Sequence, residues 1–87
     1  MTTKNELHRR TVIIDTDDNP LSVVFEMRGV TLEVPPFGHI ELRTTGPAAA
    51  SLRIGYGGPQ GLSVFRDEDL QVEVFDANGA PVDVGDF

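Results

Sequence analysis

The 87-residue sequence predicts an all-β domain, a small antiparallel β-sandwich (Ig-like or jelly-roll-like) of seven or eight short strands. Apolar and polar residues alternate through most of the stretch from Leu21 to Leu42. Turn signals rich in Gly, Pro, Asn and Asp recur about every ten residues, which is the spacing of sandwiches and small barrels. No segment shows convincing helical periodicity. A partly open barrel is the second choice.

The alternation identifies the side chains that should face the core. Apolar residues stand at odd-numbered positions from Leu21 to Met27, and the pattern resumes over residues 30–34 and 39–44. Because successive side chains of a strand point to opposite faces, each run should bury one side. Gly29 interrupts the first two runs, and we interpret it as a bend within one long strand rather than as a tight turn.

The remaining strands are expected over residues 10–15, 51–56, 62–66, 70–75 and 81–84. In the second of these, Leu52, Ile54 and Tyr56 should point inward and Arg53 outward. Residues 1–9 are polar and aperiodic, so they predict a flexible arm, or a short helical turn, that precedes a single sandwich domain over residues 10–87.

Three turns have their own signatures. The Asp- and Asn-rich segment 15–20 predicts a turn before the strand at Leu21. Pro35-Pro36-Phe37-Gly38 fits a type I turn. Asn78-Gly79 favours a two-residue type I′ hairpin. Pro81 lacks an N–H donor and therefore belongs on a sheet edge.

The segment Val72–Val82 reads Val-Glu-Val-Phe-Asp-Ala-Asn-Gly-Ala-Pro-Val. It resembles the strand and Asp-x-Asn-Gly-x-Pro-Val hairpin that is common in Ig-like and related β-sandwich modules. The resemblance covers this hairpin alone. It implies a sandwich and no particular function.

Composition excludes several functional classes. The chain has no cysteine, which removes disulfides, thiolate metal ligands and a cysteine nucleophile. Its formal charge of −7 disfavours nucleic acid and anionic membranes as partners. No apolar run approaches the roughly 20 residues that span a bilayer, and the start lacks the apolar core of a secretory signal. We therefore expect a soluble, cytoplasmic protein.

Oxygen ligands in the first acidic turn suggest a calcium site. Asp15, Asp17 and Asn19, with Glu26 further on, match four positions of an EF-hand loop, but Pro20 stands where that loop requires Gly. A looser site could add carboxylates from residues 67–69 or from Asp83 and Asp86. The alternative function is therefore a calcium- or carbohydrate-binding sandwich. The competing interpretation is a solvated acidic turn, with no cofactor.

Other chemical signals are weaker. His39 and His8 are too few and too distant in sequence for a transition-metal site. The Gly-rich segment 55–61 lacks the Lys and the helix of a phosphate-binding loop, although Tyr56 could anchor a partner there. No serine lies in a motif that activates a nucleophile, and no carboxylate pair looks buried. We therefore predict that the protein is not an enzyme.

Apolar residues on the expected solvent side carry the functional prediction. A monomer that exposes one face of each sheet does not need them, so they indicate a surface that a second protomer or another protein covers. The alternatives are that they cap the sheets or that the assumed phase is shifted by one residue. The predicted partner-binding residues are Ile13, Val24, Phe37, Tyr56, Phe65 and Phe75. We therefore expect a non-catalytic interaction or assembly module that self-associates or binds a protein.

Overall fold

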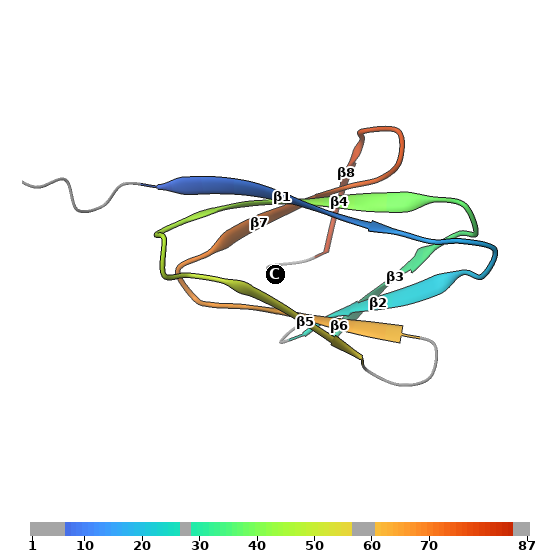
Figure 1. Cartoon of the computed structure of the whole chain (residues 1–87), viewed down its shortest axis with the longest axis horizontal. Coiled ribbons are helices and arrows are strands. Elements are labelled where there is room, and N and C mark those ends of the chain that lie inside the picture. The colour runs from blue at the N-terminus through green and yellow to red at the C-terminus, as the bar shows by residue number, and fades with distance from the viewer. Residues whose placement is uncertain (1–6, 27–28, 57–60, 85–87) are drawn as a thin grey trace, which may run out of the picture.

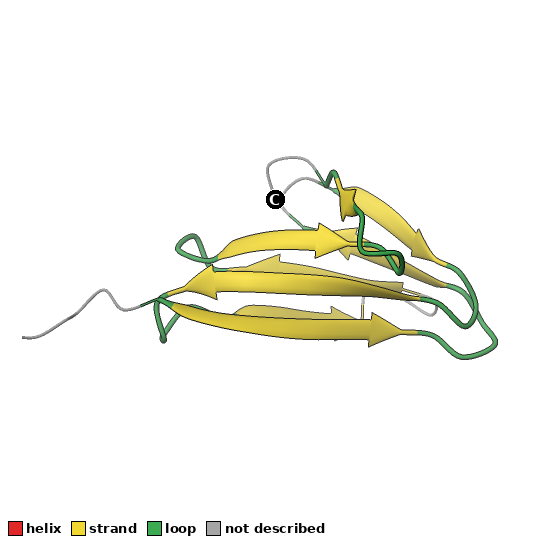
Figure 2. Ribbon diagram, turned by 90° about the horizontal axis from the view of Figure 1, so that it is seen from above, coloured by secondary structure: helices red, strands yellow, loops and turns green. Residues whose placement is uncertain are grey.

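The computed structural model describes residues 7–26, 29–56 and 61–84. These residues form eight strands and no helix. Figure 2 shows the strands and the loops between them from above. The all-β prediction is confirmed. The strands are β1 (His8–Asp15), β2 (Leu21–Phe25), β3 (Val30–Val34), β4 (His39–Gly46), β5 (Leu52–Tyr56), β6 (Gly61–Arg66), β7 (Gln71–Phe75) and β8 (Pro81–Val82).

The strands form two stacked sheets, which appear as the upper and lower layers of Figure 1. Sheet I has the order β1-β4-β7-β8 and sheet II has the order β3-β2-β6-β5. The sandwich prediction is confirmed, and the second choice of a barrel is not what forms. Pairing is antiparallel except between β2 and β6, which are parallel. The chain visits sheet I between these two strands, so the second can return in the same direction as the first.

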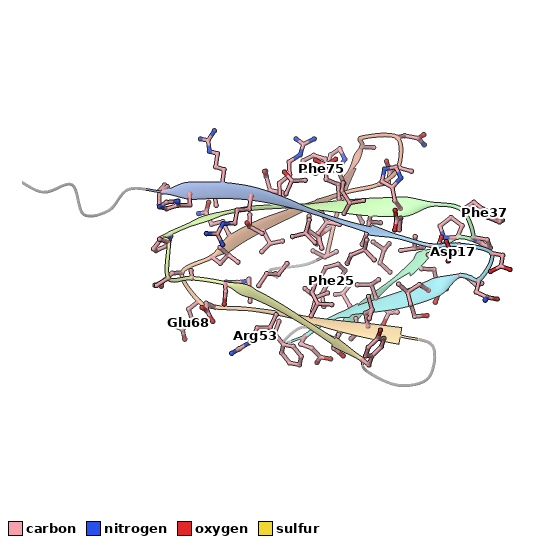
Figure 3. All side chains as sticks on the ribbon, viewed as in Figure 1. Asp17, Phe25, Phe37, Arg53, Glu68 and Phe75 are labelled. Atoms are coloured by element: carbon pink, nitrogen blue, oxygen red, sulfur yellow. The ribbon has the colours of Figure 1, made fainter. Side chains whose placement is uncertain are left out.

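The core lies between the sheets, on the faces that the alternation predicted. Val23, Phe25, Val34, Leu42 and Val64 are fully buried, and Figure 3 shows Phe25 between the two layers. The predicted inward positions of β2, β3 and β4 are confirmed. Met27, the last of the predicted inward residues, lies outside the described residues. Apolar burial of this kind stabilises the domain by about 25 cal/mol per Å² of area removed from water.

The interpretation of Gly29 as a bend within one strand is wrong. β2 and β3 pair antiparallel, with Phe25 opposite Val30, so the chain reverses between them. The Gly29 N–H donates to the Phe25 carbonyl at 3.0 Å, and Gly29 has φ of 69°. Glycine adopts this left-handed conformation at little steric cost, which is why it can close the reversal.

Two other turns differ in type from the prediction. In the β3–β4 turn the Gly38 N–H donates to the Pro35 carbonyl at 3.1 Å, while Phe37 has φ of 55°. A positive φ at the third position defines a type II turn rather than type I. Contacts with the β1–β2 turn hold this conformation: the Thr16 hydroxyl donates to the Pro35 carbonyl at 2.6 Å, and the Phe37 N–H donates to the Asp17 carbonyl at 2.7 Å.

The β7–β8 hairpin uses a three-residue loop instead of the predicted two-residue type I′ turn. Only Gly79 has a positive φ, of 83°, whereas type I′ requires a second one at Asn78. The Asp76 carboxylate accepts from the N–H groups of Asn78 and Ala80, each at 2.9 Å. This side chain therefore selects the wider loop, as Asp commonly does in turns. β8 is the edge strand that Pro81 predicted.

The strand at the N-terminal end begins earlier than predicted. The prediction places His8 and Arg9 in the flexible arm, yet both belong to β1, where they pair with Gly46 and Thr45 of β4. Residues 1–6 of that arm lie outside the described residues. The extension matters because it carries basic side chains along the edge of sheet I.

Candidate interaction surface

The six predicted partner-binding residues do not form one patch. Ile13 and Phe75 lie on the outer face of sheet I, and Val24 and Phe65 lie on the outer face of sheet II. Phe37 is in the β3–β4 turn, and Tyr56 ends β5. The exposed fraction is largest for Tyr56 at 91% and Phe37 at 81%, whereas Val24 and Phe75 are half-buried.

Phe75 is covered by side chains of its own sheet. The Arg43 guanidinium lies 4.0 Å from the centre of the Phe75 ring, and the same group forms an ion pair with Glu41 at 2.6 Å. A cation over an aromatic face is attracted by the ring quadrupole. Ile13 lies on the other side of Glu41 from Phe75, in the same cross-strand row, and is half exposed. This outer face is therefore a mixed polar and apolar surface.

The outer face of sheet II is similar. Val24 lies between Thr31 and Ser63 on the neighbouring strands. Phe65 is 40% exposed and lies opposite Arg53, which Figure 3 shows projecting away from the sandwich. Isolated apolar residues among polar neighbours are normal on protein surfaces.

Strand β5 is different, because two of its three inward-pointing side chains, Ile54 and Tyr56, are exposed, whereas Leu52 is half-buried against the core. Ile54 pairs with the fully buried Val64 of β6 and therefore points to the same inner face, yet it is 41% exposed. Tyr56 follows on that face and is almost completely exposed. The prediction that these residues face inward is correct in direction, but neither Ile54 nor Tyr56 is buried. We call β5, with the side chains of Leu52, Ile54 and Tyr56, the open edge.

The backbone of the open edge also has hydrogen-bonding groups that no other described strand pairs with. The Asp67 N–H donates to the Ser51 carbonyl at 3.2 Å, and these two residues continue the β5–β6 register. Hydrogen-bonded pairs alternate along an antiparallel ladder. Arg53 and Gly55 therefore direct their backbone groups toward β6, and Leu52, Ile54 and Tyr56 direct theirs away from the sheet.

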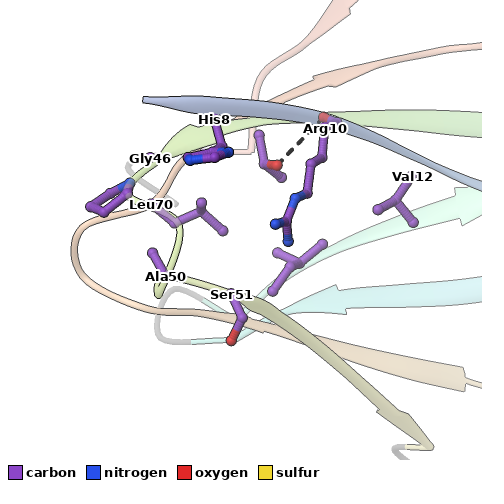
Figure 4. Close-up of a pocket in the computed structure, with 10 residues that line it drawn as sticks. His8, Arg10, Val12, Gly46, Ala50, Ser51 and Leu70 are labelled. Carbon is purple, nitrogen blue, oxygen red and sulfur yellow. Dashed lines mark hydrogen bonds between the residues drawn. The ribbon is translucent and has the colours of Figure 1, made fainter. Parts of the chain in front are cut away.

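A small cavity lies at the beginning of the open edge, between the sheets (Figure 4). Its volume is about 140 Å³. His8, Arg10 and Val12 line it from β1, and Ser51 and Leu52 line it from the opposite sheet. The Arg10 side chain points into this space in Figure 4, and its guanidinium makes no hydrogen bond or ion pair with any described residue. We call this space the basic cavity.

A second depression lies at the other end of β5. Asp15, Asp17 and Asp18 of the β1–β2 turn line it, together with Tyr56. We call it the acidic depression. β1 and β5 thus face each other across the sandwich, with basic groups near Leu52 and acidic groups near Tyr56.

Three of the calcium ligands predicted from sequence, Asp15, Asp17 and Asn19, line the acidic depression. Asp15 is the last residue of β1, and the Asp17 carbonyl accepts from the Phe37 N–H. The Asn19 amide donates to the Asp18 carboxylate at 3.5 Å. Within the described ranges, no three His, Asp or Glu side chains come together in a way that could hold a metal ion. The Asp67 carboxylate, suggested as an additional ligand, accepts from the Ser51 N–H at 3.0 Å. Asp86 lies outside the described residues.

The remaining sequence signals are not brought together. His8 and His39 stand at opposite ends of the β1–β4 pair, opposite Gly46 and Asp15 respectively. Of the Gly-rich segment, residues 57–60 lie outside the described residues. Arg10, which is not among the predicted site residues, lies on the inward side of β1 in phase with Val12. In the sequence, Arg10 shares the alternation phase of Val12 and Ile14, and a charged residue at such an inward position could have indicated the cavity.

Comparisons with known proteins give no assignment: no family model, curated protein or solved structure matches this chain. In the described part of the chain, no helix has the length and apolar character needed to cross a membrane.

Proposed function

We propose that this protein is a non-catalytic interaction module that self-associates through the open edge. The observation that supports the proposal is the exposure of Ile54 and Tyr56 on the inner face of sheet II, at 41% and 91%. Apolar side chains on that face belong to the core in every other strand of the sheet. An unpaired strand with uncovered apolar groups is a template for pairing with another chain.

The open edge also lacks acidic side chains. The whole chain carries 14 Asp and Glu residues against 7 Lys and Arg, yet β5 contains only one charged residue, Arg53. Two copies that approach each other through β5 therefore meet less electrostatic repulsion than through other surfaces. Burial of additional apolar area would also help a domain of this size, because small domains hide a limited fraction of their surface.

The mass of the protein in solution, measured by sedimentation velocity or light scattering over a wide concentration range, tests this proposal. The unmodified chain is expected to shift from monomer to a larger species as concentration rises. Tyr56→Lys should weaken that shift, since it places a charge where the apolar contact forms. It should not affect folding, because the Tyr56 ring is almost entirely in solvent.

Phe37→Lys is the matched control, since Phe37 is also an exposed aromatic residue but lies in the β3–β4 turn. It should leave self-association unchanged. A monomer at every concentration would overturn the proposal, and so would an equal loss of association in both variants.

A further inference from the structure

We propose that the partner of the open edge is β5 of a second copy, paired antiparallel about a two-fold axis at Ile54. The two copies of sheet II would then form one continuous sheet of eight strands. This inference rests on the proposed function and specifies its partner and register. Each copy would place Tyr56 beside the basic cavity of the other.

The backbone allows three registers within β5, and the side chains favour one of them. An axis at Arg53 would place the two Arg53 side chains directly opposite each other, and like charges in that position are destabilising. An axis at Gly55 would leave Leu52 unpaired by any residue of β5. An axis at Ile54 pairs Leu52 with the partner's Tyr56 and Arg53 with the partner's Gly55, so that all five residues of β5 are used.

The Ile54 register also satisfies the free backbone groups. Leu52, Ile54 and Tyr56 are the residues whose N–H and C=O point away from β6, as the Ser51–Asp67 hydrogen bond establishes. In this register each of them lies opposite another member of the same set. Each hydrogen-bonded pair exchanges two bonds, so the three pairs would form about six in total.

Shape supports the same axis. Tyr56 is a large side chain with almost no cover, and Leu52 borders the basic cavity. The two residues stand at equal distances in sequence from Ile54. A two-fold axis at Ile54 therefore brings each ring next to the other copy's cavity, where Val12 offers an apolar contact and Arg10 offers a cation for the ring face.

Charge supports the antiparallel orientation that all three registers share. The basic cavity with His8 and Arg10 lies at the Leu52 end of β5, and the acidic depression with Asp15, Asp17 and Asp18 lies at the Tyr56 end. Antiparallel pairing places the basic end of one copy near the acidic end of the other, twice per dimer. Such complementarity favours one orientation over others.

Disulfide cross-linking tests the register, and the absence of native cysteine makes the experiment simple. Ile54→Cys should form a covalent dimer under mild oxidation, since the α-carbons of a hydrogen-bonded pair are about 5.5 Å apart and disulfides span roughly 4.4–6.8 Å. Leu52→Cys and Tyr56→Cys should not dimerise singly, but an equal mixture of these two variants should form the mixed dimer.

Arg53→Cys and Gly55→Cys are the controls for the other registers. In the proposed pairing the two copies of either residue are offset by two positions, which is about 7 Å along the strands and too far for a disulfide once the separation between strands is added. Efficient linkage of either control would overturn the Ile54 axis. Self-association without linkage of Ile54→Cys would also overturn it, while leaving the proposed function intact. A monomeric unmodified chain would remove both.

Arg10→Glu tests the charge argument independently of cysteine chemistry. It should raise the dimer dissociation constant by about tenfold, because a carboxylate would then face the partner's Asp residues and the Tyr56 ring. Arg9→Glu is the matched control, since Arg9 points to the opposite, outer face of β1. An equal effect of both substitutions would contradict a specific role for the basic cavity.

Discussion

The two long sides of the sandwich differ in how well the edge of the core is covered. On the side of β8 the chain closes the gap, because Val84, two residues beyond that strand, is buried in the same core cluster as Val34 of β3. On the side of β5 only Leu52 packs against the core among the inward-pointing side chains of the edge strand, and Ile54 and Tyr56 remain exposed. Position at a sheet edge therefore does not by itself expose a strand. Exposure depends on whether another segment crosses the gap.

The edges also differ in how they resist unwanted pairing. β8 has two residues and begins with Pro81, and β1 carries Arg9 and Arg10. Short strands, proline and charge are the devices that proteins use to block edge-to-edge association. On β3, Glu33 accepts a hydrogen bond from Ser22, and Val34 is fully buried. β5 has Arg53 as its only such feature, which is consistent with an edge that pairs.

Truncation of one covered and one uncovered aromatic residue tests this contrast between the core and the open edge. Phe25→Ala removes a fully buried ring and should destabilise the domain by about 3–5 kcal/mol. Tyr56→Ala removes an exposed ring and should change the free energy of unfolding by less than about 0.5 kcal/mol. Urea denaturation at a concentration where the protein is monomeric measures both.

A large loss of stability in the monomeric Tyr56→Ala variant would show that the open edge is covered after all. A loss below about 1 kcal/mol for Phe25→Ala would contradict the position of the core between the sheets. Because a small domain has only about 5–15 kcal/mol of stability, the effect of Phe25→Ala is measured as the shift of the denaturant midpoint relative to the unmodified chain.

Substitution of two glycines should change the stability by an intermediate amount. Gly79 closes the β7–β8 loop with φ of 83°, and Gly55 lies in β5 without a positive φ. At both positions a β-carbon would have no other atom within 4 Å, so neither substitution meets a clash. Gly79→Ala should therefore cost about 1–2 kcal/mol through backbone strain alone. Gly55→Ala should stabilise the monomer by about 0.5 kcal/mol, because glycine weakens a strand interior.

The melting temperatures of the two glycine variants should move in opposite directions. A fall for both would mean that β5 does not have ordinary strand geometry. That outcome would remove the regular backbone alternation from which the free hydrogen-bonding groups of Leu52, Ile54 and Tyr56 were inferred.

The sequence predicted which way side chains point but not what covers them. Alternation correctly oriented Val23, Phe25 and Val34, and it also oriented Ile54 and Tyr56 correctly. Burial of the latter pair depends on which distant segments pack over the end of β5, which no local pattern encodes. The parallel pairing of β2 with β6 was not predicted either. The apolar and polar alternation of a strand with one buried face is the same whether its neighbour is parallel or antiparallel.

Turn types were less predictable because they depend on one or two backbone angles. Contacts between two turns hold Phe37 at φ of 55°, and the Asp76 carboxylate selects the loop around Gly79. Of the predicted partner-binding residues, Tyr56 alone lies on the open edge. The basic cavity was not predicted because Arg10 stands at the polar start of the expected strand, whereas β1 begins at His8 and places Arg10 within its inward-facing row.

The smallest effect is expected from the addition of calcium, whose predicted ligands lie at the acidic depression. Calcium at millimolar concentration should leave the melting temperature unchanged, because no three carboxylates among the described residues converge on one point and calcium requires six to eight oxygen ligands. A specific site would raise the midpoint in proportion to ln(1 + [L]/Kd). Magnesium at the same concentration is the control for general screening of the net charge of −7. A rise of the melting temperature with calcium but not with magnesium, abolished by Asp17→Asn, would establish the calcium site. The cation would then lie at the Tyr56 end of β5, where the proposed dimer places its acidic contact.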